Sequence, residues 1–221
     1  MKKADYTIEE LHQKLKSGEI RSSELVTEAT EKAHFYQKDY NCFVTILDTA
    51  QTKEEISDNP LSGIPYALKD NMSTKGVLTT ASSNILKDYV PFFDATVAEK
   101  LKESGAVMIG KTVLDELAMG GTGTTAHTGV VRNPWDKERM IGGSSSGSAA
   151  AVAIGIVPFA LGSDTGDSIR KPAAYGGVVG FKPTYGRVSR YGLFPFACSL
   201  DHIGCFTRSV KDAAYVIDAI K

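Results

Sequence analysis

Two loops rich in serine and glycine hold the side chains most suited to chemistry in this chain. The first covers residues 142–148 and the second 162–168, and the run Ala149–Leu161 between them contains no charged residue. Serine hydroxyls are potential nucleophiles, and successive backbone N–H groups in a glycine-containing loop can converge on one oxyanion. We therefore expect the apolar run to be buried and the two loops to meet at the rim of one sheet.

These loops match two familiar catalytic motifs, but neither match has the partners that its chemistry requires. Gly143–Gly147 fits Gly-x-Ser-x-Gly, a nucleophile elbow that needs an acid and then a histidine downstream, and only His202 follows it. Ser168–Lys171 fits Ser-x-x-Lys, which requires a helix to place the lysine beside the serine. Because Pro172 disfavours helical geometry at the residue before it, we expect this second match to be incidental as well.

A general base has to come from outside the two loops. The histidines are scattered and lack metal-ligand spacing: His12, His34, His127 and His202. Lys69 is better placed, because it follows the apolar segment Gly63–Leu68 and would emerge at the end of a buried strand. Desolvation disfavours the charged ammonium, so a buried lysine can accept a proton near neutral pH. The alternative is that Lys69 simply pairs with Asp70 or with another carboxylate.

Hydrophobic periodicity predicts alternating strands and helices from about residue 60 onward, after a largely helical N-terminal segment. We expect helices over 7–18, 22–40, 94–104, 112–118, 149–153 and 209–221, and strands over 43–47, 63–68, 106–110, 154–161 and at the start of 176–183. Residues 52–59 are polar, and the composition of residues 185–199 predicts an ordered surface loop. This order predicts an α/β sheet with at least one parallel crossover. We place an N-terminal helical layer at 1–58 and the α/β core at 59–221.

Composition sets only broad limits on function. The 221 residues carry a formal net charge of -1, so nothing in the overall charge calls for nucleic acid binding. The three cysteines match neither a disulfide framework nor a metal site, which indicates a reducing, cytoplasmic compartment. The sequence has no signal-peptide core and no apolar stretch of membrane-spanning length, so we expect no membrane association.

From Gly63 onward the chain resembles the amidase signature family. Three motifs carry the resemblance: Gly142–Ala151, Gly162–Arg170 and Gly180–Thr184. Within that family it is most similar to the A subunits of glutamyl-tRNA(Gln) amidotransferases, on the segments Asn133–Asp136, Tyr185–Leu193 and Ser199–Gly204. The resemblance implies a mixed sheet flanked by helices, in agreement with the strand and helix pattern.

The resemblance also implies a Ser-Ser-Lys triad. Ser168 would be the nucleophile that forms the acyl-enzyme, Ser144 would sit on a cis peptide and relay the proton, and Lys69 would be the base. The backbone N–H groups of the segment from Thr165 through Gly166 and Asp167 to Ser168 would form an oxyanion hole. The resemblance places Met119 among the substrate contacts and implies no metal in this chain.

The implied task is to hydrolyse glutamine and to supply ammonia for the conversion of Glu-tRNA(Gln) to Gln-tRNA(Gln). The B and C subunits of a heterotrimer would be the partners, and ATP and Mg²⁺ would belong to one of these partners, together with most contacts to tRNA. Two alternatives stay open, namely a stand-alone amidase acting on small amides and a non-catalytic scaffold protein of the complex.

Three features depart from the family pattern. Asp167 stands where a glycine is usual, directly before the nucleophile, and its charge should oppose an oxyanion unless it is neutralised. We hypothesise that Lys171, four positions on, pairs with it. Ser146 replaces a common glycine, a small change. The sequence is also about half as long as the family core, so we expect a fragment or a shortened paralogue.

Overall fold

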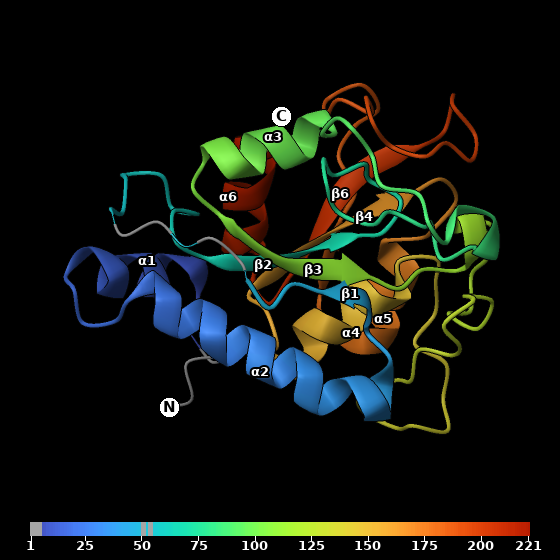
Figure 1. Ribbon diagram of the computed structural model, residues 1–221, viewed down its shortest axis with the longest axis horizontal. Helices are drawn as coiled ribbons and strands as arrows, with labels where there is room; N and C mark the ends of the chain where they lie inside the picture. Colours follow the sequence, from blue (N-terminus) through green and yellow to red (C-terminus); the bar gives the residue numbers. More distant parts are fainter. Residues whose placement is uncertain (1–5, 50–51, 53–54) are drawn as a thin grey trace.

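A computed structural model of the protein, which describes residues 6–49, 52 and 55–221, has a six-stranded mixed sheet at its centre (Figure 1). The strand order is β1-β3-β2-β4-β6-β5. The strands are β1 (Phe43–Ile46), β2 (Pro65–Lys69), β3 (Val107–Thr112), β4 (Phe159–Asp164), β5 (Val179–Phe181) and β6 (His202–Thr207). Strands β3, β2 and β4 are mutually parallel, whereas β1, β6 and β5 pair antiparallel with their neighbours. The expected α/β class and its parallel crossover are confirmed.

Helices cover both faces of this sheet (Figure 1). Helices α2 (Ser22–Tyr40), α4 (Ser146–Ile154) and α5 (Arg170–Gly176) pack on one face, and α3 (Thr96–Glu103) and α6 (Val210–Ile220) on the other. The N-terminal α1 (Ile8–Lys16) begins with a capping box between Thr7 and Glu10, in keeping with the predicted helix start, and contributes its apolar side chains to the α3 and α6 side. Each face therefore has its own apolar core.

The central strands are buried on both faces, which explains why they read as unbroken apolar runs. Every residue of β2 and of β4 is buried. The helix over β4 on the α2 side is α4, whose residues Ala149–Val152 are all 0% exposed. Its alanines let the helix backbone lie close to the sheet.

The structure corrects several predicted boundaries. Strand β4 begins at Phe159 rather than at residue 154, because α4 continues to Ile154 and a turn through Gly155 follows. The helix expected over 112–118 is wrong: β3 runs to Thr112, and only a short 3-10 turn, η3 (Glu116–Ala118), follows it. A second 3-10 turn, η2 (Asn84–Leu86), was not predicted. The polar segment 52–59 lies partly outside the described residues.

Two elements were missed. Helix α5 contains Pro172, and the prediction that this proline keeps Lys171 out of a helix is wrong. Pro172 is the third residue of α5, in the first turn, where a backbone N–H has no intrahelical partner to lose. Strand β6 was missed because Gly204 interrupts its apolar pattern, yet it pairs with β4 along its whole length.

The first 58 residues contain more than helices, because β1 lies among them and pairs with β3. The division of the chain at residue 58 stays a prediction.

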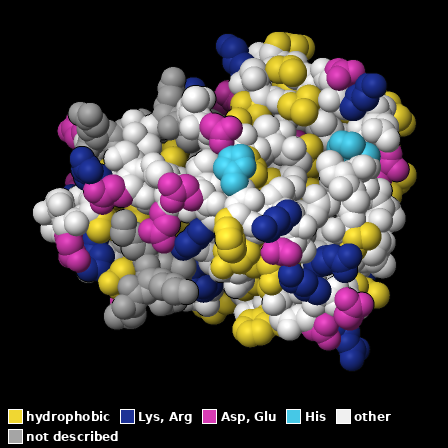
Figure 2. Space-filling model, turned by 60° about the horizontal axis from the view of Figure 1, so that its bottom comes forward, with side chains coloured by type: hydrophobic (Ala, Val, Ile, Leu, Met, Phe, Trp, Pro, Cys, Tyr) yellow, Lys and Arg dark blue, Asp and Glu magenta, His cyan; other side chains and the backbone are white. Residues whose placement is uncertain are grey.

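No helix among the described residues is long and apolar enough to cross a membrane. On the face shown in Figure 2, acidic and basic side chains are interspersed, in keeping with the formal net charge of -1.

Candidate active site

The serine loops and the candidate lysine meet at one edge of the sheet. Strands β2 and β4 are neighbours and parallel, with Leu68 opposite Leu161, so their carboxyl ends lie together. Lys69 ends β2, and the second serine loop continues from the end of β4. The first serine loop enters α4, which packs on β4. The sequence-based expectation that both loops share one rim is confirmed.

Lys69 is completely buried and surrounded by hydroxyl groups. Its Nζ atom lies 2.8 Å from Ser144 Oγ, 2.9 Å from Ser145 Oγ and 2.8 Å from Ser163 Oγ. Burial lowers the pKa of Lys69 to about 7, against the opposing effect of three aspartates farther away: Asp115, Asp164 and Asp201. Lys69 is therefore able to exchange a proton with a hydroxyl at neutral pH.

The alternative partner, Asp70, is occupied by another lysine. Successive strand residues point to opposite faces, so Asp70 faces away from Lys69. The Asp70 carboxylate lies 3.6 Å from Nζ of Lys111, and its other oxygen accepts hydrogen bonds from the Thr80 N–H at 2.9 Å and hydroxyl at 2.5 Å. Burial raises the pKa of the Asp70 carboxyl, and it lowers the pKa of Lys111 to about 8. Lys111 was missed, although a lone charge within an apolar strand was its signal.

Ser144 follows a cis peptide bond, as the resemblance implied. The bond joins Gly143 to Ser144, and Ser144 is 0% exposed. Gly143 lies against Asp115, since a Cβ atom at Gly143 would be 2.0 Å from the Asp115 carboxylate. Asp115 also accepts the N–H groups of four consecutive residues, Thr122, Gly123, Thr124 and Thr125. Sequence reasoning missed Asp115, which fixes the glycine loop beside Ser144.

Ser168 lies in the loop after β4 with its hydroxyl uncommitted. The residue is 6% exposed, and in the part of the chain that the structure describes its hydroxyl makes no hydrogen bond. The backbone N–H groups of residues 165–168 likewise have no acceptor among the described residues. The Ser168 carbonyl accepts the Ser145 N–H at 3.2 Å, which ties the two serine loops together. The geometry thus offers a free hydroxyl beside a row of free donors.

Two carboxylates hold this loop from either end, and neither was singled out from the sequence. Asp164 accepts two hydrogen bonds from the Arg170 side chain and one from the Ile169 N–H. Burial by itself would raise the pKa of Asp164, but these hydrogen bonds together hold it below its usual value. At the other end Asp201 accepts the Thr165 hydroxyl at 2.6 Å.

The hypothesised pairing of Asp167 with Lys171 is confirmed. Their charged groups are 2.6 Å apart, with Asp167 in the loop before α5 and Lys171 in the first turn of that helix. Lys171 is also the lysine of the Ser-x-x-Lys match, and its amine is thus paired with Asp167. Asp167 is not among the described residues with positive φ, so no glycine-like conformation is needed there.

The other two positions that the sequence singled out also differ in their surroundings. Ser146 is buried, with its hydroxyl 3.4 Å from the Val113 carbonyl, whereas Met119 is 57% exposed. A substrate contact at Met119 stays a prediction.

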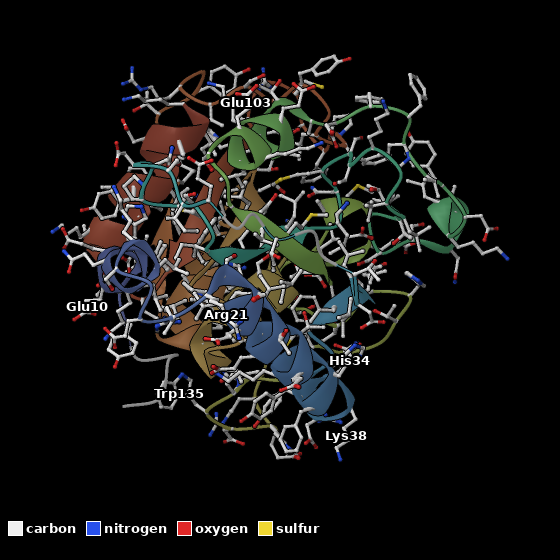
Figure 3. The ribbon with its side chains drawn as sticks, turned by 60° about the vertical axis from the view of Figure 1, so that its left-hand side comes forward. Glu10, Arg21, His34, Lys38, Glu103 and Trp135 are labelled. Atoms are coloured by element: carbon white, nitrogen blue, oxygen red, sulfur yellow. The ribbon has the colours of Figure 1, made fainter. Side chains whose placement is uncertain are left out.

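Among the described residues no histidine side chain bonds to a serine of the two loops, although His202 on β6 lies opposite Asp164 at the end of β4. His202 contacts the Leu200 carbonyl at 2.6 Å and the ring of Tyr185. His34 projects from α2 beside Lys38 (Figure 3) and lies 2.6 Å from Asp48. Among the described residues, no group of three or more His, Cys, Asp and Glu could hold a metal ion.

Comparisons with known proteins cover nearly the whole chain. A protein-family model described as Amidase matches residues 24–221. The A subunit of the glutamyl-tRNA(Gln) amidotransferase of Oenococcus oeni is 55% identical over 218 residues, which is 95% of this chain and 45% of that protein. The chain therefore spans about half the length of the curated relatives it matches.

Solved structures of amidases are similar to this chain over nearly its whole length. The A subunit of the glutamyl-tRNA(Gln) amidotransferase of Thermotoga maritima has a TM-score of 0.88 and 44% identity, over 98% of this chain and 47% of that one. The peptide amidase of Stenotrophomonas maltophilia has a TM-score of 0.90 and 34% identity, over 98% of this chain and 48% of that one.

Proposed function

The chain belongs to the amidase family, and from that premise we propose that it cleaves amides through a Ser-Ser-Lys triad. Ser168 is the nucleophile, Ser144 the proton relay and Lys69 the base. The observation that carries the proposal is the contact of 2.8 Å between Lys69 Nζ and Ser144 Oγ, made by a fully buried lysine. A buried amine whose pKa is near 7 can take a proton from a hydroxyl and return it.

In each half of the reaction, the proton of the attacking group passes along the triad. As Ser168 Oγ bonds to the amide carbon, its proton passes to Ser144 Oγ, and the Ser144 proton passes to the Lys69 lone pair. The carbonyl oxygen becomes an oxyanion, which the N–H groups of residues 165–168 stabilise. The Lys69 ammonium then returns a proton through Ser144 to the leaving nitrogen, and the amine departs. Water repeats these steps on the acyl-serine, releasing the acid.

The substrate that we propose is glutamine, in the glutaminase component of a tRNA-dependent amidotransferase. The names of the relatives from Oenococcus oeni and Thermotoga maritima support this assignment. Hydrolysis yields glutamate and ammonia, and the ammonia converts Glu-tRNA(Gln) to Gln-tRNA(Gln) in the cytoplasm. The B and C subunits complete a heterotrimer, in which a partner supplies the ATP and Mg²⁺ chemistry and most tRNA contacts.

A second candidate is a stand-alone amidase, which the likeness to a peptide amidase supports. Ammonia release is the discriminating measurement. Release from glutamine that depends on added B and C subunits favours the amidotransferase. Release from small amides by the chain alone favours the stand-alone enzyme.

Covalent labelling tests the triad without requiring a complete substrate pocket. We expect phenylmethanesulfonyl fluoride to add one sulfonyl group per folded chain, detected by intact mass, with loss of fluoride. Ser168→Ala and Lys69→Ala should abolish labelling. Ser148→Ala is the matched control, because this serine is also buried but donates its hydroxyl to the Leu161 carbonyl. A folded wild-type chain that stays unlabelled, or a label that persists in Ser168→Ala, would exclude the proposed triad.

A further inference from the structure

Two serines outside the triad also contact the Lys69 amine. Given the proposed roles of Lys69, Ser144 and Ser168, on which this assignment rests, we infer that Ser145 and Ser163 are positioning residues that turn the Lys69 lone pair towards Ser144. Both are nearly inaccessible, with exposed fractions of 0% and 4%.

The need for such a device follows from the surroundings of Nζ. A neutral amine has two N–H donors and one lone pair, and here its three nearest neighbours are hydroxyls that can either donate or accept, while the Ser163 carbonyl oxygen lies farther away at 3.4 Å. If the three hydroxyls were equivalent, the lone pair would point at Ser144 in only some orientations of the amine. A relay through Ser144 requires that the other two hydroxyls accept hydrogen bonds.

Ser145 can only accept from Lys69. Its hydroxyl lies 3.0 Å from the Ser163 carbonyl, which has no proton to give, so the single proton of Ser145 is donated there. Its oxygen is left with lone pairs for a Lys69 N–H at 2.9 Å. The backbone fixes this arrangement, because the Ser145 N–H is itself held by the Ser168 carbonyl.

Ser163 is approached by two donors. The Asn71 side-chain nitrogen lies 3.0 Å from Ser163 Oγ, and Lys69 Nζ lies 2.8 Å from the same oxygen. Two donors directed at one hydroxyl oxygen use both of its lone pairs. Asn71 is 1% exposed and lies in the turn after β2, so it keeps Ser163 in place.

Ser144 is the remaining neighbour, and its hydroxyl has no other hydrogen bond among the described residues. With both N–H groups of the amine donated to Ser145 and Ser163, the lone pair is directed at the Ser144 proton. The hydrogen bonds of Lys69 with Ser144, Ser145 and Ser163 thus favour proton transfer from Ser144 to Lys69.

The test is the pH dependence of sulfonyl fluoride labelling in Ser145→Ala and Ser163→Ala. In the wild type the rate should rise with pH through the titration of Lys69, near pH 7. An acceptor that faces a lysine stabilises the ammonium more than the amine, so removing it should lower the pKa of the base. We expect this rise to move about one pH unit lower, and the plateau rate to fall about tenfold.

Other charged groups that face Lys69 are unchanged in these variants, namely Asp115 after β3, Asp164 at the end of β4 and Asp201 before β6. Ser148→Ala again serves as the control and should keep the wild-type profile. Thermal unfolding of each variant separates loss of fold from loss of rate. Because the two serines lie on different segments, either variant alone provides the test.

The direction of the shift is decisive. A rise that moves to higher pH would mean that the deleted hydroxyl donated to Lys69, and profiles identical to that of Ser148→Ala would mean that it had no influence. Either result overturns the positioning role while leaving the triad intact. Failure of the wild type itself to label would instead exclude the proposed function and the positioning role with it.

Discussion

At the scale of single residues, the site depends on Lys69, which has no carboxylate of the described residues in direct contact. The alternation of side chains along β2 sends Asp70 to the opposite face, where Lys111 pairs with it 3.6 Å away. Lys69 is left among neutral hydroxyls, and its charged form is destabilised by burial. This cost should be visible in the stability of the protein.

The replacement Lys69→Met should remove one component of the pH dependence of folding. The Lys69 pKa is about 7 in the folded protein and about 10.4 in an unfolded chain, so between these values the unfolded chain binds one proton more. The wild-type free energy of unfolding therefore rises with pH in this window, and the full cost of the buried ammonium is present below pH 7. Relative to Lys69→Met, the wild type should gain about 2 kcal/mol between pH 7 and pH 9.

Urea denaturation at pH 7, 8 and 9 measures this difference. The exposed Lys87 provides a control, since Lys87→Met should run parallel to the wild type. Parallel curves for Lys69→Met as well would show that Lys69 does not titrate in this range.

The pair of Asp167 and Lys171 leads to a prediction about rate. In Lys171→Gln the Asp167 carboxylate loses its partner at 2.6 Å and opposes the negative charge of an oxyanion bound to the neighbouring N–H groups. Because both side chains are partly exposed, we expect sulfonyl fluoride labelling at low salt to slow only about two- to fivefold. Lys171→Arg should retain the wild-type rate, and the effect should vanish when Asp167 is replaced by glycine in the same chain. An unchanged rate in Lys171→Gln would refute the compensation.

At the scale of elements, the close approach of α4 to the sheet positions Ser144 and Ser145. The helix begins at Ser146, and the Gly147 N–H donates to the Val113 carbonyl at 2.9 Å. A Cβ atom at Gly147 would lie 2.2 Å from the Cys42 carbonyl oxygen and 2.7 Å from the Val113 nitrogen. Both are backbone atoms of neighbouring segments, which cannot move aside separately.

Gly147→Ala should therefore lower the free energy of unfolding by about 3 kcal/mol and reduce labelling of Ser168, because α4 shifts away from the sheet. Gly166→Ala is a matched comparison for stability, since a Cβ atom there meets nothing within 4 Å. It should change the free energy of unfolding by less than about 1 kcal/mol. Equal midpoints for the two variants in urea would contradict the packing argument.

At the scale of the whole molecule, the two ends of the described chain are joined. Helix α1 packs beside α6, and the Ile8 N–H donates to the buried Asp212 carboxylate at 2.9 Å. Apolar side chains of both helices belong to the same core as β2 and β4. The N-terminal helix is thus part of the folding unit that contains the site, although it lies far from the serine loops.

The variant Asp212→Ala should leave the Ile8 N–H without its acceptor and cost about 1–3 kcal/mol of global stability. Hydrogen exchange should increase first in α1 and α6. Asp218→Ala, at an exposed position that pairs with Lys221, should leave both measurements near wild type. Protection of α1 that survives in Asp212→Ala would show that apolar packing alone holds this helix.

The sequence by itself determined the elements with a strong local signal. Helices α1, α2, α3 and α6 follow from amphipathic spacing, with side-chain caps at Thr7 and Ser209 for α1 and α6, and β2 and β3 follow from apolar runs. The family resemblance carried by the serine and glycine motifs also named Lys69, Ser144 and Ser168 as the candidate triad. Local signals failed at Pro172, which a first turn tolerates, and at β6, whose partner β4 lies far away along the chain.

Only the tertiary structure decided what surrounds the chosen residues. Burial lowers the pKa of Lys69. The packing of β2 beside β3 places Asp70 next to Lys111. The supporting groups Asp115, Ser145, Ser163 and Asp201 lie on separate segments that meet only when β2 and β4 are paired. Residue types and spacing encode local conformation and can reveal a family motif, whereas solvent exclusion and hydrogen-bond direction arise from contacts between distant segments.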